Sequence, residues 1–245
     1  MTIIRTITAL IFTCLAFTVQ ADDEKLESLR ANLKQRIPGM AIESIAPAPL
    51  PGLYEVIADG QIYYVNESAT HLVQGSIIDL ENRNNLTEQR LGGVHLNLIE
   101  SIGEEDMLIY EPDESTDRSI TVFTDTSCPY CSKLHNEIDV LLEAGVRVRY
   151  LLYPRAGINS STFEELRSVW CADDQQAAMT AAKAGEQVAP GECDNPIEEH
   201  IAVAQQVGLR GTPLIYLDNG KRIPGYQDAA ALLEQLTDTD KISLH

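Results

Sequence analysis

ITVFTDTSCPYC, residues 120–131, decides the fold, because a strand-like run leads directly into two cysteines separated by two residues. Ile120 to Thr124 is rich in β-branched and apolar side chains, and the cysteine pair opens a helix expected to reach about Ala144. Val146 to Tyr153 is a second run of apolar and β-branched residues. Two strands joined by a helix predict a βαβ unit with a parallel sheet.

The rest of the C-terminal half extends this unit. A long helical region is expected from about Ser161 to Val207, followed by a strand from Leu214 to Leu217. A short turn joins that strand to another from Lys221 to Ile223, and a final helix runs from about Asp228 to Leu236. The order β-α-β, helical insertion, β-β-α predicts an α/β thioredoxin fold with a helical insertion over residues 107–245.

Residues 22–81 are predicted to form a separate α+β unit that begins with an amphipathic helix. Asp22 to Arg36 has the apolar spacing of such a helix, and Pro38-Gly39 ends it. Its apolar face holds three leucines, Leu26, Leu29 and Leu33. The core of so short a unit is thin, and oligomerisation would complete it.

Four strand-like segments follow this helix. Residues 53–57 and 61–65 flank Asp59-Gly60, which is a strong hairpin signal. Residues 71–74 and 76–80 lie on either side of a further glycine. Together they predict the β part of the first unit.

Residues 82–106 are polar and mostly compatible with a helix, so they predict a helical linker between the two domains. Gly92-Gly93 interrupts this stretch, and the paired glycines predict a flexible point. A helix boundary at the same place is the alternative.

The first residues have the three-part pattern of a secretory signal peptide. Arg5 precedes an apolar stretch from about Ile7 to Val19, and the small residues Val19 and Ala21 bracket a cleavage site after Ala21. The stretch is shorter than the about 20 apolar residues that span a bilayer, so we expect export without membrane insertion. A lipoprotein cysteine at Cys14 is the alternative, which the bulky residues before it disfavour.

The charge balance is strongly acidic. The chain has 18 Lys and Arg residues against 37 Asp and Glu residues, and loss of Arg5 with the leader leaves 17 basic residues and a formal charge of −20. A surface this acidic argues against nucleic acid or anionic lipid as a partner. Solubility of an exported protein is the simpler explanation of the charge.

Four cysteines follow the leader, and their spacing divides them into two pairs. Cys128 and Cys131 are too close to cross-link a useful length of chain, which indicates a reactive pair. Cys171 and Cys193 would close a loop of about 23 residues, which the chain-entropy model values at roughly 3 kcal/mol. An exported protein favours disulfides, so this second pair is expected to be structural.

The Cys-x-x-Cys pair at the junction of a strand and a helix favours thiol–disulfide exchange. The helix N-terminus stabilises a thiolate on Cys128, whose pKa is expected in the range of about 3.5–7.5. Pro129 fits the first turn without loss of a helix hydrogen bond. Cys131 lies one turn further in, close enough to attack a mixed disulfide on Cys128. We therefore expect Cys128 to be the attacking cysteine and Cys131 the resolving cysteine.

Other chemistries fit this pair less well. Covalent haem requires His directly after the second cysteine, and the residue there is Ser132. His135 could join the pair in a zinc site, but the sequence supplies no fourth ligand, so no metal is expected. A purely structural disulfide between Cys128 and Cys131 is the remaining alternative.

Gly211-Thr212-Pro213 immediately precedes the strand expected at residues 214–217. Proline cannot donate to a sheet, so its place at the start of a strand indicates an edge or a special turn. With the cysteine motif present, we expect a cis bond between Thr212 and Pro213, in a loop that faces the cysteine pair and binds extended substrate. An ordinary trans proline that opens a strand is the alternative.

Together these features resemble the DsbC/DsbG family of periplasmic disulfide isomerases over nearly the whole chain after the leader. In the first unit the resemblance lies in Ala46–Pro49, Gly52–Val56, Leu72–Gly75 and Asn85–Glu88. In the second unit it lies in Val122–Asp125, Arg149–Leu151, Tyr153–Arg155, Trp170–Ala172, Val188–Pro190, Gly211–Pro213 and Pro224–Tyr226. The combination is more specific than Cys-x-x-Cys alone.

The resemblance implies an architecture and an activity. It implies a cystatin-like N-terminal dimerisation domain and a V-shaped homodimer in which two catalytic domains face a shared uncharged cleft. It also implies isomerisation of non-native disulfides in misfolded exported proteins, chaperone activity, a periplasmic location and no cofactor. The membrane thiol reductase DsbD is the implied electron donor.

The same resemblance assigns roles by position. Cys128 is the nucleophile and Cys131 its partner, whereas Cys171 and Cys193 match the structural disulfide of the DsbC branch. The residues expected to contact substrate are Pro129, Tyr130, Thr212 and Pro213.

The dipeptide between the cysteines departs from the DsbC pattern. It is Pro129-Tyr130, as in the DsbG branch, whereas the DsbC branch usually has Gly-Tyr. The Cys171 and Cys193 pair and the surrounding segments are typical of DsbC, and we weigh this longer match above the dipeptide. A DsbG-like reductase of oxidised single cysteines, a dithiol oxidase and a chaperone-type binding module are the alternatives.

Overall fold

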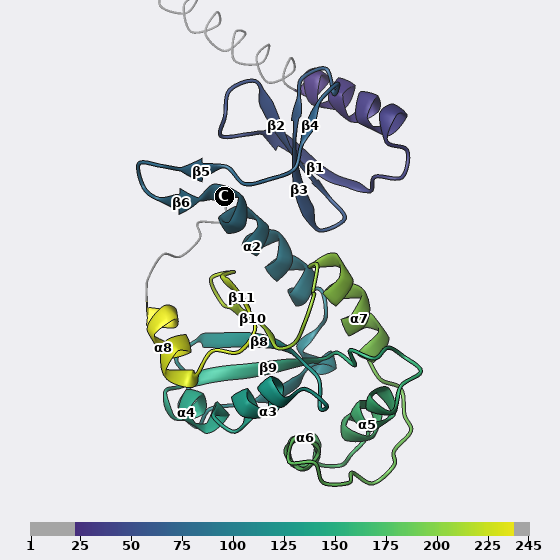
Figure 1. The fold of residues 1–245 in the computed structure, drawn as a ribbon, viewed down its shortest axis with the longest axis vertical. Helices are drawn as coiled ribbons and strands as arrows, with labels where there is room; N and C mark the ends of the chain where they lie inside the picture. Colours follow the sequence, from purple (N-terminus) through teal and green to yellow (C-terminus); the bar gives the residue numbers. More distant parts are fainter. Residues whose placement is uncertain (1–22, 238–245) are drawn as a thin grey trace, which may run out of the picture. The chain divides into compact units, whose positions relative to one another are not determined.

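The computed structural model describes residues 23–237, in two compact units of which the first ends at Thr87 and the second begins at Glu88 (Figure 1). The expected leader, residues 1–21, lies outside the described residues, and so does Cys14. Within residues 23–237, no helix is both long enough and apolar enough to cross a membrane.

The first unit packs one helix against an antiparallel sheet. The helix spans residues 23–36 and buries Leu29 and Leu33 in one apolar core with Val56 and Val65 of the sheet. The sheet has the order β1-β2-β3-β4. Its strands are β1 (Ile42–Pro47), β2 (Leu53–Ala58), β3 (Gln61–Asn66) and β4 (Leu72–Val73).

The hairpin between β2 and β3 follows directly from its turn residues. Asp59 and Gly60 have positive φ angles of 52° and 67°, as a two-residue type I′ turn requires. The later segments do not pair with each other, because β4 adds to β3 whereas β5 (Ile78–Asp79) pairs with β6 (Asn84–Asn85). β1 was not predicted, since its buried and exposed residues do not alternate.

The second unit contains a five-stranded sheet in the order β11-β10-β8-β9-β7. β8 and β9 are parallel, and the other neighbouring pairs of this sheet are antiparallel. The strands are β7 (Leu108–Tyr110), β8 (Arg118–Thr124), β9 (Val146–Leu152), β10 (Leu214–Leu217) and β11 (Arg222–Pro224). This arrangement confirms the predicted thioredoxin fold and adds β7, which was not predicted.

Helices cover both faces of this sheet (Figure 1). α3, α4 and α8 join one apolar core with Val122, whereas α2 and α7 join a second with Phe123. Val122 and Phe123 are neighbours on β8, so the two cores lie on opposite faces. The helices are α2 (Leu86–Glu100), α3 (Pro129–His135), α4 (Ile138–Glu143), α5 (Ser161–Trp170), α6 (Gln175–Lys183), α7 (Ile197–Gln206) and α8 (Ala229–Thr237).

Two long helices expected from the sequence are divided in the structure. The helix after the cysteine pair breaks at Asn136-Glu137 into α3 and α4. The expected helical region from Ser161 to Val207 contains α5, α6 and α7, and residues 184–196 are not helical. Cys193 lies in this loop and forms a disulfide with Cys171 at the end of α5.

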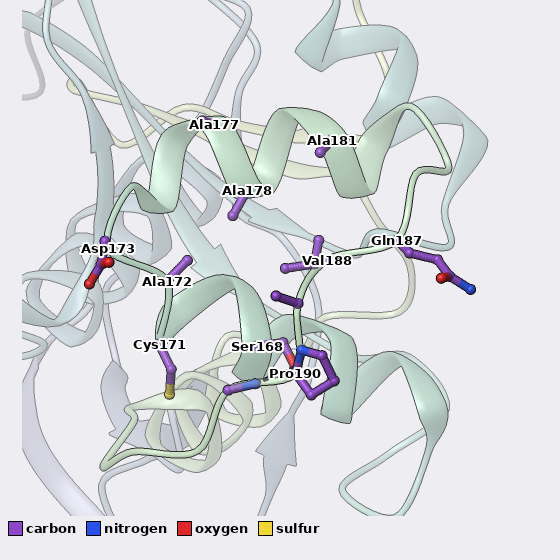
Figure 2. A pocket seen from close by; sticks show the side chains of 12 residues that line it. Ser168, Cys171, Ala172, Asp173, Ala177, Ala178, Ala181, Gln187, Val188 and Pro190 are labelled. Carbon is purple, nitrogen blue, oxygen red and sulfur yellow. Dashed lines mark hydrogen bonds between the residues drawn. The ribbon is translucent and has the colours of Figure 1, made fainter.

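The disulfide holds the loop after α6 against α5. The loop and the two helices surround a shallow pocket of about 480 Å³, lined mostly by small side chains (Figure 2). A Cβ atom at Gly191 would lie 2.9 Å from the Cβ of Cys171, so the loop backbone approaches α5 closely. Both contacts hold this loop against the end of α5.

α2 runs through Gly92-Gly93 without interruption, contrary to the expected break. The helix packs on the second unit, where His95 Nδ1 is 2.8 Å from the Tyr216 hydroxyl. A Cβ atom at Gly92 would lie only 2.4 Å from the carbonyl oxygen of Gly220. Glycine therefore serves close packing of α2 on the turn after β10 rather than flexibility.

We expect Gly92→Ala to destabilise the second unit, although alanine normally favours a helix over glycine by about 1 kcal/mol. The new methyl group would overlap the Gly220 carbonyl, and overpacking of this kind costs about 1–3 kcal/mol. Asn97→Ala, on the exposed side of the same helix, is the matched control. Urea unfolding measures both, and an unchanged or higher unfolding free energy for Gly92→Ala would contradict the packing role.

Candidate active site

The two reactive thiols lie at the start of α3. Cys128 caps this helix and Pro129 occupies its first turn. Cys128 and Cys131 are free thiols, 2% and 1% exposed, whereas Tyr130 between them is 62% exposed. The pair is therefore sheltered, and Tyr130 marks its solvent side.

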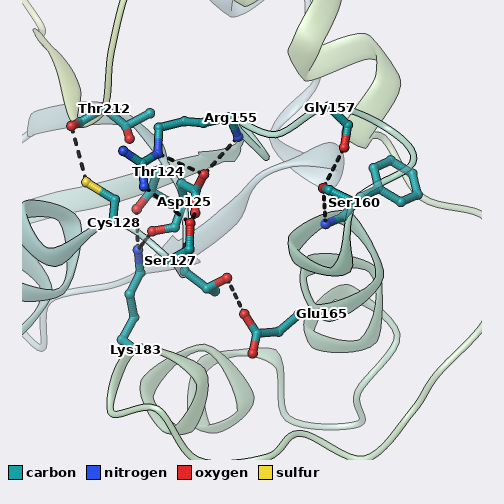
Figure 3. Close-up of polar contacts among 12 residues, drawn as sticks. Thr124, Asp125, Ser127, Cys128, Arg155, Gly157, Ser160, Glu165, Lys183 and Thr212 are labelled. Carbon is teal, nitrogen blue, oxygen red and sulfur yellow. Dashed lines mark hydrogen bonds and ion pairs between the residues drawn. The ribbon is translucent and has the colours of Figure 1, made fainter.

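The loop of Thr212 and Pro213 lies against Cys128. The bond between the two residues is cis, and Cys128 Sγ donates to the Thr212 carbonyl oxygen at 3.3 Å (Figure 3). The buried Thr212 hydroxyl has no hydrogen-bond partner among the described residues. It is placed to donate to an ionised sulfur of Cys128 or Cys131. The structure thus brings the cysteine pair and the proline loop together.

Aromatic side chains extend from the exposed side of the pair. Tyr130 stacks on Tyr226 with ring centroids 6.3 Å apart, and Lys133 Nζ lies 4.4 Å from the Tyr226 ring centroid. The Tyr226 hydroxyl donates to Glu137, which fixes this ring. Such a surface suits apolar and aromatic side chains of a bound peptide.

The carboxylate of Asp125 organises the loop that holds Cys128. It is fully buried, and it accepts hydrogen bonds from Ser127 N and Oγ at 2.6 Å and from Arg155 N and Nε at 2.8 and 3.1 Å (Figure 3). The Asp125 carbonyl oxygen accepts from Cys128 N at 3.2 Å. Burial opposes ionisation of Asp125, but these bonds outweigh it and lower the pKa below its ordinary value.

Two cations lie beside the thiols. Arg155, which follows β9, pairs with the Asp125 carboxylate, and its positive charge acts on Cys128. Lys183, at the end of α6, donates to the Asp125 carbonyl oxygen at 2.8 Å, and its charge acts on Cys131. Each cation also interacts with the other thiol, so both positive charges act on both cysteines.

The groups around Cys128 and Cys131 shift the pKa values of the two thiols in opposite directions. Burial raises the pKa of the Cys128 thiol. Hydrogen bonds from the Thr212 side chain and from Cys131 to the ionised sulfur, together with the charge of Arg155, outweigh burial, so the pKa falls below its ordinary value. Burial dominates at Cys131 and raises its pKa, although the charge of Lys183 opposes this. Cys128 is the more readily ionised of the two, as an attacking cysteine must be.

His135, which the sequence offered as a zinc ligand, forms contacts with hydroxyl groups instead. Its Nδ1 is 3.1 Å from the Tyr150 hydroxyl and its Nε2 is 3.0 Å from the Thr180 hydroxyl. Both nitrogens thus contact hydroxyl groups. Across the described part of the chain, no three His, Cys, Asp or Glu side chains are grouped to hold a metal ion.

Sequence reasoning did not identify Asp125, Arg155 and Lys183. Asp125 and Arg155 stand inside two of the segments that resemble the DsbC/DsbG family, but spacing alone does not show that their side chains meet. Lys183 has no signal beyond a single lysine in an alanine-rich stretch, residues 181–184. Only the three-dimensional fold brings these groups together.

We expect Arg155→Met to raise the pKa of the Cys128 thiol, because it removes a cation and leaves the Asp125 carboxylate unpaired. A rise of about one pKa unit would move the pH profile of Cys128 alkylation by iodoacetamide about one unit toward alkaline pH, with a rate about tenfold lower at pH values below the pKa and an unchanged alkaline plateau. Mass spectrometry of the Cys128 peptide measures this rate. Arg147→Met, in a surface ion-pair cluster, is the control. Superimposable pH profiles for Arg155→Met and the parent would contradict the assigned role.

Two family models match the chain. The Disulfide bond isomerase protein N-terminal domain matches residues 17–88, and the Thioredoxin-like domain matches residues 106–239. The two matches correspond to the two structural units.

Named relatives align along most of the chain. The chain is 34% identical over 226 residues to the thiol:disulfide interchange protein DsbC of Escherichia coli K12, with 91% of both chains covered. It is 37% identical over 210 residues to the DsbC protein of Salmonella typhimurium, with 84% of both covered. It is 32% identical over 244 residues to that of Dickeya dadantii, with 96% of this chain and 95% of that one covered. The chain therefore belongs to the DsbC family of thiol:disulfide interchange proteins and is a disulfide isomerase.

Proposed function

We propose that Cys128 and Cys131 are the redox-active pair of a periplasmic isomerase and reductase of misfolded exported proteins with non-native disulfides. The supporting observation is the charge around two buried free thiols. Among the described residues, the cations Arg155 and Lys183 and the carboxylate of Asp125 surround them. This excess of positive charge stabilises a thiolate and so favours the dithiol form. An isomerase needs that form to begin its reaction.

Exchange begins when the Cys128 thiolate attacks a substrate disulfide. A bond forms between Cys128 and one substrate sulfur, and the other substrate sulfur leaves as a thiolate and takes up a proton. A second substrate thiolate can then attack the mixed disulfide, which frees Cys128 and leaves a rearranged disulfide. Alternatively Cys131 attacks Cys128, which releases reduced substrate and leaves a Cys128–Cys131 disulfide.

The proline loop and the residues between the cysteines hold the substrate in this proposal. In the reduced form the Thr212 carbonyl oxygen accepts from the Cys128 thiol. Once Cys128 is bonded to a substrate sulfur, this oxygen becomes available to a substrate N–H group. Pro213, Pro129 and the exposed Tyr130 contact the substrate side chains around that bond.

Refolding of a scrambled multi-disulfide protein tests these roles. Cys128→Ala should abolish refolding, because no thiolate remains to attack. Cys131→Ala should instead accumulate mixed disulfides with substrate, visible on non-reducing gels. Full activity of Cys128→Ala would overturn the proposal. A double Cys128→Ala and Cys131→Ala variant that still replaces the protein in cells would indicate chaperone holding as the main role.

A homodimer joined through the first unit is part of the proposal. β4 lies at one edge of its sheet, and its residues Leu72 and Val73 are 40% and 53% exposed. Ile78 and Leu80, which follow in the chain, are 53% and 84% exposed. An exposed apolar edge strand is a template for pairing with another chain, and two copies of β4 can pair about a twofold axis.

Sedimentation of an edge-strand variant tests the dimer. Val73→Lys places a charge on the pairing edge and should convert a dimer into a monomer. Val140→Lys alters an equally apolar residue of α4, 47% exposed in the second unit, and should leave the dimer intact. A monomeric parent chain, or a dimeric Val73→Lys variant, would contradict the proposed interface.

The proposal also includes a periplasmic location, unfolded exported chains as substrates and a membrane reductase as electron donor. The leader-like pattern of residues 1–21 supports export to the periplasm with cleavage after Ala21. Membership of the DsbC family supports chaperone-like holding of unfolded chains and re-reduction of the Cys128–Cys131 disulfide by the membrane thiol reductase DsbD.

A DsbG-like reductase of oxidised single cysteines is the second candidate, which the Pro129-Tyr130 dipeptide favours. Its preferred substrate would contain one sulfenic acid rather than a wrongly paired disulfide. Parallel assays with a sulfenylated single-cysteine protein and a scrambled multi-disulfide protein separate the two activities. We expect faster turnover of the scrambled protein.

A further inference from the structure

Lys183 is a buried cation beside the active-site helix. It is the last residue of α6, and it is 7% exposed. Its Nζ donates to Thr124 Oγ1 at 2.7 Å and to the Asp125 carbonyl oxygen at 2.8 Å (Figure 3). Both acceptors are neutral, and the Asp125 carboxylate is bound by Arg155 instead.

A buried ammonium group needs a negative partner. Removal of such an ion from water costs several kcal/mol even after relaxation, and bonds to a hydroxyl and a carbonyl do not cancel a full charge. Burial lowers the pKa of Lys183 to about 8, while the thiols of Cys131 and Cys128 and the carboxylate of Asp125 act in the opposite direction. Lys183 shares the charge of Asp125 with Arg155, so a thiolate is the further anion needed to balance both cations. The carbonyl oxygen that accepts from Lys183 Nζ also accepts from Cys128 N, which places the ammonium group at the start of the active-site helix.

The other titratable groups nearby do not fill this role. His135 on α3 stays neutral, because burial and the charge of Lys183 lower its pKa to about 4. Asp139 on α4 acts on His135, and Glu165 on α5 accepts a hydrogen bond from the Thr126 hydroxyl. Beside the shared Asp125 carboxylate, the cysteine pair is therefore the group that can supply negative charge to Lys183.

α6 is fastened so that Lys183 keeps its place. His135 and Thr180 join α3 to α6 one helical turn before Lys183, with 3.0 Å between Nε2 and Oγ1. The Cys171–Cys193 disulfide holds the loop that follows α6. The helical insertion thus brings a charged group to the thiols as well as covering the sheet.

We propose that Lys183 is a positioning residue for the resolving step, whose ammonium group stabilises the Cys131 thiolate as it forms. The inference rests on the proposed roles of Cys128 and Cys131. Both cations interact with both thiols, but Lys183 is the largest of the influences that lower the pKa of Cys131.

In the resolving step, the Cys131 thiol gives its proton to solvent and the thiolate attacks the Cys128 sulfur of the mixed disulfide. The Cys128–Cys131 bond forms and the bond from Cys128 to substrate breaks. The electron pair leaves on the substrate sulfur, which takes up a proton, so the substrate is reduced and the enzyme pair is oxidised. Burial makes the Cys131 thiolate scarce, so a cation beside it raises the rate of this step.

Titration of Cys131 in a Cys128→Ser background tests the inference. Only Cys131 then titrates as a thiol among the described cysteines, since Cys171 and Cys193 are disulfide-bonded. Adding Lys183→Met should slow alkylation of Cys131 at neutral pH about tenfold, which corresponds to a rise of about one pKa unit. The alkaline plateau should stay the same, whereas a merely structural change in access would alter the rate at every pH.

Two further variants control for the charge. Lys183→Arg keeps the cation and should restore most of the alkylation rate. Lys221→Met removes an exposed lysine of the second unit and should have no effect. In the chain with both cysteines, Lys183→Met should also lengthen the lifetime of a Cys128–glutathione mixed disulfide about tenfold. Profiles for Lys183→Met that match the parent would overturn the inference.

A measurement on the unaltered chain tests the same inference even if the Lys183 variants fail to fold. NMR titration of ¹³C-labelled lysine side chains follows Lys183 in the dithiol and disulfide forms. Because coupling between two ionising groups is reciprocal, Lys183 should titrate at higher pH in the dithiol form. Identical titration in both forms would overturn the inference.

Refolding of a scrambled protein by the unaltered chain separates the two proposals. If refolding fails while the Lys183 effects are present, the isomerase proposal falls and the Lys183 inference stands. If refolding succeeds and the Lys183 effects are absent, the inference about Lys183 alone falls.

Discussion

The buried carboxylate of Asp125 is the group on which the rest of the site depends. It lies where β8 ends, and its oxygens bind Ser127 and Arg155 while its carbonyl oxygen binds Cys128 N and Lys183. One residue therefore fixes the start of α3 and the positions of both cations. Asp125 directly follows β8, the central strand of the sheet, and precedes α3, so the fold itself determines which groups meet the thiols.

The charges around the cysteine pair favour one redox state. Two cations, Arg155 and Lys183, share one permanent anion, Asp125, so a thiolate completes the balance in the reduced form. In a Cys128–Cys131 disulfide neither sulfur is charged, and the buried ammonium group of Lys183 loses the thiolate that balances it. Stabilisation of the reduced form makes the disulfide easier to reduce, which suits a protein that begins its cycle as a dithiol.

The sequence predicts those features of the molecule that depend on residues close together in the chain. The thioredoxin fold and the reactive thiols of Cys128 and Cys131 rest on strand periodicity and cysteine spacing. β1 was missed because its burial does not alternate, and β7 was missed because it has only three residues. Asp125, Arg155 and Lys183 were missed as a cluster, because their contacts join segments up to 58 residues apart. Gly92 was misread as flexible, because the close approach of Gly220 is a tertiary contact.

The redox state of Cys128 and Cys131 in intact cells tests most directly whether the surrounding charges hold the pair reduced. Rapid acid quenching followed by alkylation with a mass-shifting thiol reagent measures the reduced fraction by gel mobility. The Cys171–Cys193 disulfide does not react and so provides an internal reference. We predict a pair that is mostly reduced. A pair that is mostly oxidised would contradict this charge argument and indicate a dithiol oxidase.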